Sequence, residues 1–190
     1  MGYRIVVKGA SGSGKTTLAA RLATAVGAPH VELDAIHHGP GWAAPPLEEF
    51  RSHVERLTAG ESWVVDGNYD LKLGDMVLRR ADLVVWLDPP LRTILARLYR
   101  RTKTRIRDDV ELWNGNRESW RGALLGRDSL FVWAIRTHFR HRLKLRRWAH
   151  AAGVPLVRLR SDDDVERWLE TLPQTSTTTG RIIGRRPVRS

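Results

Sequence analysis

The chain has 190 residues, of which 42% are hydrophobic and 28% charged, as in folded globular proteins. It contains no cysteine, which excludes a disulfide framework, and no apolar run approaches the roughly 20 residues that span a bilayer, so we expect a cytoplasmic protein without membrane contact. Its net charge of +11 lies entirely in residues 91–147, which hold 16 Lys/Arg and 5 Asp/Glu.

A strand, a glycine-rich loop and a helix are predicted at the start of the chain. Tyr3–Val7 is an apolar strand pattern and Thr16–Val26 a helical one. The residues between them match the phosphate-binding pattern G-x-x-x-x-G-K-[ST], in which glycines turn backbone amides inward and the helix N-terminus favours an anion. We therefore predict ATP as the cofactor, bound by Gly9, Ala10, Ser11, Gly12, Ser13, Gly14, Lys15, Thr16 and Thr17.

Two residues of this loop have more specific predicted roles. Lys15 is expected to reach the β- and γ-phosphates and to act in catalysis. The Thr16 hydroxyl is expected to hold Mg²⁺.

Apolar and helical segments then alternate along the chain. Such alternation predicts an α/β fold with a parallel sheet covered by helices on both faces. The further strands are predicted at His30–Leu33, Ser62–Val65, Leu83–Leu87 and Val154–Leu159, and the helices at Leu47–Ala59, Leu91 to about Arg107, Val110–Gly122, Ser129–Ala152 and Asp162–Leu172. Residues 173–190 are expected to form a disordered basic tail.

Two aspartates follow predicted strands, where ligands bind in open α/β sheets. Asp34 follows the second strand and is predicted to accept the proton of an attacking hydroxyl or to hydrogen-bond a small-molecule phosphoryl acceptor. Asp66 follows the third strand, where phosphate-loop proteins hold Mg²⁺. The alternative for each is a turn or a helix cap.

The basic helix contains arginines on one face. Arg97, Arg101 and Arg105 recur every four residues, and guanidinium groups donate bidentately to phosphate. We expect Arg97, Arg101 and the later Arg117 to neutralise charge on the transferring phosphoryl group. Alternatively, residues 91–147 face outward and bind nucleic acid, with tryptophans stacking on bases.

The chain resembles the small P-loop kinases of the adenylate- and shikimate-kinase-like group, and within it the bacterial topology-modulation proteins or adenylate-kinase-like ATPases. The resemblance spans about residues 3–170. It rests on Gly9–Thr16, Glu32-Leu33-Asp34, Pro40-Gly41-Trp42, Asp66-Gly67-Asn68-Tyr69, Arg80-Ala81-Asp82, Trp86-Leu87-Asp88-Pro89, Leu112-Trp113 and Gly115-Asn116-Arg117-Glu118.

The resemblance implies a P-loop NTPase three-layer sandwich with a five-stranded parallel sheet of order 2-3-1-4-5. It also implies one domain over residues 1–172, an acceptor region at about 34–60 and a helical, arginine-bearing lid at about 100–128. Adenylate kinases continue with Phe-Pro-Arg after Asp-Gly, whereas this chain has Asn68-Tyr69-Asp70. Arg117 or Arg51 would have to replace the missing acceptor-phosphate arginine.

These observations predict a Mg²⁺-dependent phosphotransferase that moves the ATP γ-phosphate to a nucleotide or related metabolite, as a monomer or homodimer. The alternative is an NTP-dependent protein that binds nucleic acid and modulates DNA topology. The sequence leaves the acceptor unnamed.

Overall fold

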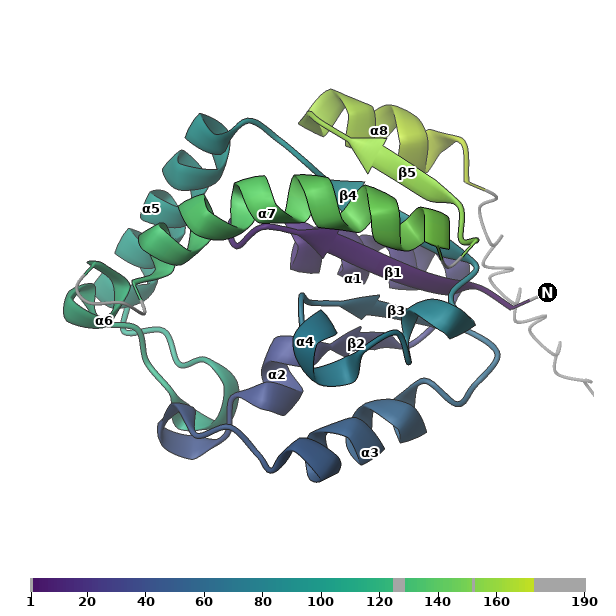
Figure 1. Cartoon of the computed structure of the whole chain (residues 1–190). Helices are drawn as coiled ribbons and strands as arrows, with labels where there is room; N and C mark the ends of the chain where they lie inside the picture. Colours follow the sequence, from purple (N-terminus) through teal and green to yellow (C-terminus); the bar gives the residue numbers. More distant parts are fainter. Residues whose placement is uncertain (1, 125–128, 152, 173–190) are drawn as a thin grey trace, which may run out of the picture.

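The computed structural model describes residues 2–124, 129–151 and 153–172, so the predicted tail at 173–190 lies outside the described residues. A parallel five-stranded sheet of order β2-β3-β1-β4-β5 forms the centre of the molecule (Figure 1). The predicted fold class and strand order are confirmed. The strands are β1 (Arg4–Gly9), β2 (His30–Glu32), β3 (Trp63–Asp66), β4 (Leu83–Leu87) and β5 (Leu156–Leu159).

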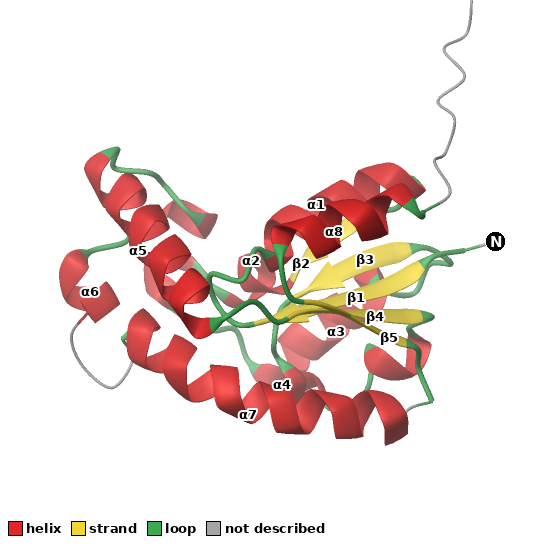
Figure 2. Cartoon of the chain, turned by 90° about the horizontal axis from the view of Figure 1, so that it is seen from above, coloured by secondary structure: helices red, strands yellow, loops and turns green. Residues whose placement is uncertain are grey.

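Helices cover both faces of this sheet (Figure 2). The α-helices are α1 (Lys15–Val26), α2 (Leu33–His37), α3 (Leu47–Leu57), α4 (Asp70–Leu73), α5 (Leu91–Arg107), α6 (Trp120–Leu124), α7 (Leu130–Ala151) and α8 (Asp162–Glu170). Three short 3-10 turns are η1 (Pro40–Trp42), η2 (Leu78–Arg80) and η3 (Trp113–Gly115). No helix in the described ranges is long and apolar enough to cross a membrane.

The core has two halves because successive strand side chains point to opposite faces. Ile5 and Val7 of β1 pack with α1 and with the apolar side of α8. Val6 points the other way, into a cluster with Phe50 and Val54 of α3. Both clusters exclude water and fix the strands in place. The polar residues that follow the strands therefore have fixed positions.

The prediction of a helix at Val110–Gly122 is wrong. Residues 108–119, here called the lid loop, contain the turn η3 and an antiparallel bridge between Glu111 and Arg117, and helix begins only at Trp120. Asn114 has φ 57° and Gly115 has φ 78°, a left-handed pair that interrupts any helix. The Asn-Gly turn signal therefore outweighed the helical periodicity around it.

The lid loop and α5 lie at the carboxyl ends of the strands, as does α2 (Figure 1). Helix α5 is anchored by Ile94 and Leu98, which pack against Ala10 and against Ala134 of α7. Its arginines therefore occupy fixed positions near the loop that follows β1.

Candidate active site

The loop between β1 and α1 has the geometry of an anion-binding site. Gly14 precedes α1 with φ 96° and Gly12 has φ 82°, conformations that residues with a Cβ rarely adopt. A Cβ at Gly12 would also lie 2.9 Å from the carbonyl oxygen of Ile94. Lys15 is 9% exposed and has no hydrogen-bond or ion-pair partner among the described residues. A buried ammonium at a helix N-terminus is suited to bind a polyphosphate.

Thr16 and Asp66 meet beside this loop. The Thr16 hydroxyl donates to Asp66 Oδ1 over 3.3 Å, and Asp66 is fully buried. His30 Nε2 lies 2.8 Å from Asp66 Oδ2, and this hydrogen bond raises the pKa of His30. A hydroxyl next to a carboxylate suits Mg²⁺, which prefers oxygen ligands and keeps several from water and phosphate. The residues therefore fit this ion.

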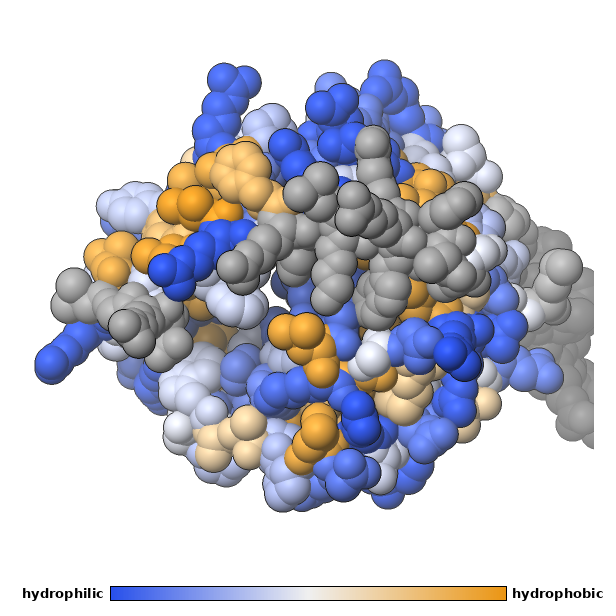
Figure 3. All heavy atoms as spheres, in the orientation of Figure 1, coloured by the Kyte–Doolittle hydropathy of each residue, from blue (hydrophilic) through white to orange (hydrophobic). Residues whose placement is uncertain are grey.

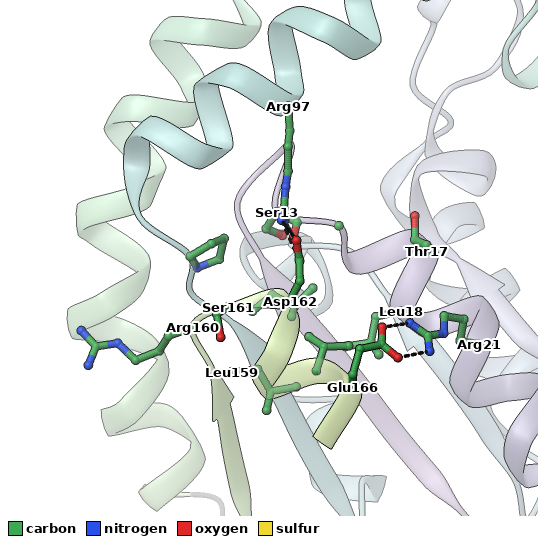
Figure 4. Close-up of a pocket in the computed structure, with 14 residues that line it drawn as sticks. Ser13, Thr17, Leu18, Arg21, Arg97, Leu159, Arg160, Ser161, Asp162 and Glu166 are labelled. Atoms are coloured by element: carbon green, nitrogen blue, oxygen red, sulfur yellow. Dashed lines mark hydrogen bonds and ion pairs between the residues drawn. The ribbon is translucent and has the colours of Figure 1, made fainter. Parts of the chain in front are cut away.

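A cavity of about 310 Å³ opens beside the phosphate loop (Figure 4). Its walls come from the phosphate loop and the first turns of α1, the end of β4 and the loop after it, Arg97 of α5, and the turn from β5 into α8. Its position next to Gly14 and Thr17 suits the nucleoside part of a nucleotide whose phosphates lie on the loop. Its lining includes Ser13, Thr17, Leu18, Pro89, Leu159, Arg160, Ser161 and Val165.

Arg97 reaches from α5 to the phosphate loop (Figure 4). One terminal nitrogen donates to the carbonyl oxygen of Ser13 over 3.1 Å, and the other donates to both carboxylate oxygens of Asp162 over 2.7 and 2.6 Å. The structure therefore brings Arg97 to the predicted ATP site and holds it there by a bidentate ion pair.

Asp34 lies on α2, at the carboxyl end of β2, and is held by Tyr69. The Tyr69 hydroxyl donates to Asp34 Oδ1 over 2.8 Å and lies 3.4 Å from His38 Nε2. Burial and the neighbouring Asp34 charge raise the pKa of Tyr69, so the phenol keeps its proton. One carboxylate oxygen of Asp34 is thus fixed while Oδ2 has no protein donor among the described contacts.

The lid loop contacts the segment that follows α2. Asn116, which is 4% exposed, donates to the carbonyl oxygens of Gly39 and Trp113 over 2.9 and 2.8 Å and accepts from the Trp42 amide over 2.9 Å. Trp113 donates its indole N–H to Glu32 over 3.1 Å, and its ring stacks on His38 at 5.6 Å. The lid loop is therefore joined to the acceptor region by side chains of both segments.

Arg101 and Arg105 face the lid loop one and two turns after Arg97. Arg105 donates to Glu118 Oε1 over 2.6 Å, and Arg101 lies 3.9 Å from the same oxygen. Burial and the Arg105 charge lower the pKa of Arg101, while the charges of Glu118 and Asp34 oppose this shift. Among the described residues, Glu118 Oε2 and Arg101 Nε are buried without hydrogen-bond partners. Arg101 therefore keeps an unused donor next to the lid loop.

Arg117 has a different environment. It pairs with Asp109 and lies 3.9 Å from Glu111, both in the lid loop, and about half of its side chain is exposed. The structure does not bring it to Lys15 or Asp34, so its predicted role in charge neutralisation stays a prediction.

Several residues at the site carried no predicted role. Lys8 is buried in β1, where its ammonium donates to the Gly67 carbonyl over 2.8 Å and to Asp70 over 2.7 Å. Asn68 donates to the carbonyl oxygen of Gly9 over 2.6 Å. These contacts join the phosphate loop to the segment after β3. The one available signal was a lysine inside an otherwise apolar strand.

Figure 3 shows this face of the molecule hollowed left of its centre, between the region of α5 and the region of α2. Arg101 belongs to α5 and Asp34 to α2. The site thus has a donor side, formed by the phosphate loop and its cavity, and an acceptor side, formed by α2, the residues after β3 and the lid loop.

Comparison with known proteins finds similarity among solved structures. No protein-family model matches the chain, and no curated protein does. Among solved structures, a gluconokinase from Sinorhizobium meliloti 1021 matches with a TM-score of 0.50 and 21% identity, over 89% of this chain and 94% of that one. The two chains share a fold, that of a P-loop kinase, across nearly their whole lengths.

Proposed function

We propose that this protein is an ATP-dependent kinase that transfers the γ-phosphoryl group to a hydroxyl of a small acceptor. The observation that carries the proposal is the unpaired, buried Lys15 in a phosphate loop whose next residue, Thr16, contacts Asp66. A fold shared with a gluconokinase supports the same class of reaction.

Each group of site residues has its own role in this reaction. The loop amides and Lys15 bind the β- and γ-phosphates, and the cavity beside Thr17 takes the nucleoside. Thr16 and Asp66 hold Mg²⁺, which when bound supplies positive charge to the phosphate oxygens. Arg97 stabilises the loop through the Ser13 carbonyl, and Arg101, one turn further along α5, supplies positive charge to the transferring phosphoryl group.

Asp34 orients the acceptor. Its Oδ1 is held by Tyr69, which leaves Oδ2 to accept a hydrogen bond from the attacking hydroxyl. Oδ2 takes the hydroxyl proton as the new P–O bond forms and as the bond between the γ-phosphorus and the bridging oxygen breaks to release ADP. The lid loop, fastened to Gly39 and Trp42 by Asn116, restricts the access of water to the acceptor side.

The test is ATP turnover by the full chain against nucleoside monophosphates, sugars and sugar acids, and oligonucleotides. We expect one small-molecule class to stimulate ADP formation and to appear as a phosphorylated product. Stimulation by oligonucleotides alone, without such a product, would support the nucleic-acid alternative and overturn the proposal.

A further inference from the structure

Lys72 of α4 is a cation without an acidic partner among the residues that the structure describes. Its ammonium lies 3.0 Å from His37 Nε2, between α4 and α2. Burial, followed by the charges of Lys72 and His38, lowers the pKa of His37 to about 4, so the imidazole is neutral at neutral pH and accepts this hydrogen bond. In that tautomer Nδ1 carries the proton, and Nδ1 is buried without a partner.

The neighbouring carboxylates are already paired. Asp70 binds Lys8 over 2.7 Å, and Asp75 binds Arg79 over 2.6 Å. No ion pair joins Lys72 to a carboxylate within the described ranges. A partly buried ammonium that rests on a neutral group retains most of its capacity to bind an anion.

Arg51 adds a second positive charge next to α4. Its Nε donates to the backbone carbonyl oxygen of Lys72 over 2.7 Å, which holds the guanidinium against α4. Among the described residues it forms one ion pair, with the largely exposed Glu48 at 4.0 Å. The terminal nitrogens of Arg51 therefore remain available to an oxyanion.

His37, which Lys72 contacts, lies beside Asp34, the residue proposed to hold the acceptor hydroxyl. Asp34 and His37 are three residues apart on α2, a spacing that places two side chains on one helix face roughly 5–6 Å apart. Tyr69 connects them, since its hydroxyl binds Asp34 and its ring packs edge-on against His37 at 4.6 Å.

We propose that Lys72 and Arg51 bind an oxyanion of the acceptor, so that the substrate is a small hydroxylated anion. This inference rests on the proposed kinase function and adds the substrate class to it. The hydroxyl that attacks ATP and the carboxylate or phosphate held by Lys72 then lie about one helical turn apart.

The experiment follows the His37 imidazole nitrogens by NMR in the full chain, with the donor site occupied by Mg²⁺ and a non-hydrolysable ATP analogue. Inorganic phosphate and acetate are titrated separately at constant ionic strength near neutral pH. We expect saturable shifts of the His37 signals with at least one anion, and the more effective anion identifies a phosphate or a carboxylate as the group recognised.

Variants make the assignment specific. Lys72→Gln is expected to weaken the anion response about tenfold or more, as for the loss of one charge-assisted hydrogen bond, and Arg51→Gln to weaken it less. Lys72→Arg keeps the charge and should retain most of the response. Lys103→Gln removes an exposed lysine of α5 and is the matched control.

The inference is overturned if neither anion shifts His37, or if the response of Lys72→Gln equals that of the unaltered protein. Binding of the ATP analogue is measured in the same samples. If the analogue fails to bind, the kinase proposal alone is overturned. The anion titration is then carried out on the Lys15→Ala variant, in which the phosphate loop no longer competes for phosphate.

Discussion

The donor and acceptor sides of the site are constructed in different ways. The proposed donor side comes from one continuous stretch, Gly9–Thr17, whose backbone amides and helix N-terminus are suited to bind phosphate. The acceptor side is assembled from α2, the residues after β3, α5 and the lid loop, and it uses side chains throughout.

The charged groups of the two sides also differ. Lys15 of the phosphate loop has no counter-ion in the described chain, and neither has Lys72 on the acceptor side. The acceptor side, however, also holds paired groups: Glu118 is bound by Arg105, and Asp34 is held by the Tyr69 hydroxyl. These paired groups can exchange an internal partner for a substrate, whereas Lys15 has no internal partner to exchange. Changes on the donor side should therefore stop the reaction for any acceptor, and changes on the acceptor side should alter the selection and positioning of one.

The largest effect is expected for Lys15→Ala. Loss of the ammonium removes charge stabilisation of the β- and γ-phosphates, and kcat should fall about a thousandfold or more with every acceptor. Turnover by a coupled ADP assay measures this, with Lys103→Ala as the exposed-lysine control. A Lys15→Ala variant of full activity would contradict the assignment of the donor side.

Asp34→Asn should affect the chemical step without affecting ATP binding. The amide keeps the shape and can still contact Tyr69, but it cannot take the hydroxyl proton, so kcat should fall about 10²- to 10⁴-fold while KM for ATP stays unchanged. The matched control is Asp75→Asn, which removes only an exposed pair with Arg79. An equal loss in both variants would remove Asp34 from the mechanism.

Asn116→Ala should loosen the lid loop. The substitution removes two donated bonds, to Gly39 and Trp113, and one accepted from Trp42, each worth about 1 kcal/mol. We expect KM for the acceptor to rise about tenfold with a smaller change in kcat, and amides of the lid loop to exchange hydrogen faster. Asn114→Gly, which loses one exposed bond to His38 and tolerates the left-handed conformation of this position, should have a smaller effect on both measurements.

The smallest effect is a pH dependence of stability due to His37. Its pKa is lowered to about 4 in the folded protein, from an ordinary value of 6.5. The unfolded chain therefore takes up a proton below 6.5 that the folded chain refuses, so the free energy of unfolding falls as pH decreases from 6.5 toward 4 and is unaffected by this group above 6.5.

Urea unfolding at about pH 7 and about pH 5 tests this, with the unaltered protein compared with His37→Gln. The decrease in unfolding free energy should be smaller in the variant, because the variant lacks the His37 imidazole. The carboxylates contribute equally to both proteins. His53→Gln, at an exposed position of α3, should leave the decrease unchanged. An identical decrease in all three proteins would show that His37 is not held neutral.

Prediction from sequence succeeded where local rules dominate. The limits of β4 and α5 agree with Leu83–Leu87 and Leu91–Arg107, since Pro89-Pro90 separates a buried apolar run from a long basic helix. It failed at 110–119, where Asn114 and Gly115 adopt positive φ, and it gave no sign of α2 or α4, which are too short to show a period.

The sequence by itself determined the donor side, because a phosphate loop is built from consecutive residues and depends on glycines and one lysine in fixed order. Only the tertiary structure decided the acceptor side. Asp34 meets Tyr69, and Lys72 meets His37, across about 35 residues of chain. Arg117 lies with Asp109 instead of with the site. Such pairings depend on how separate strand ends and loops pack together, which no local pattern encodes.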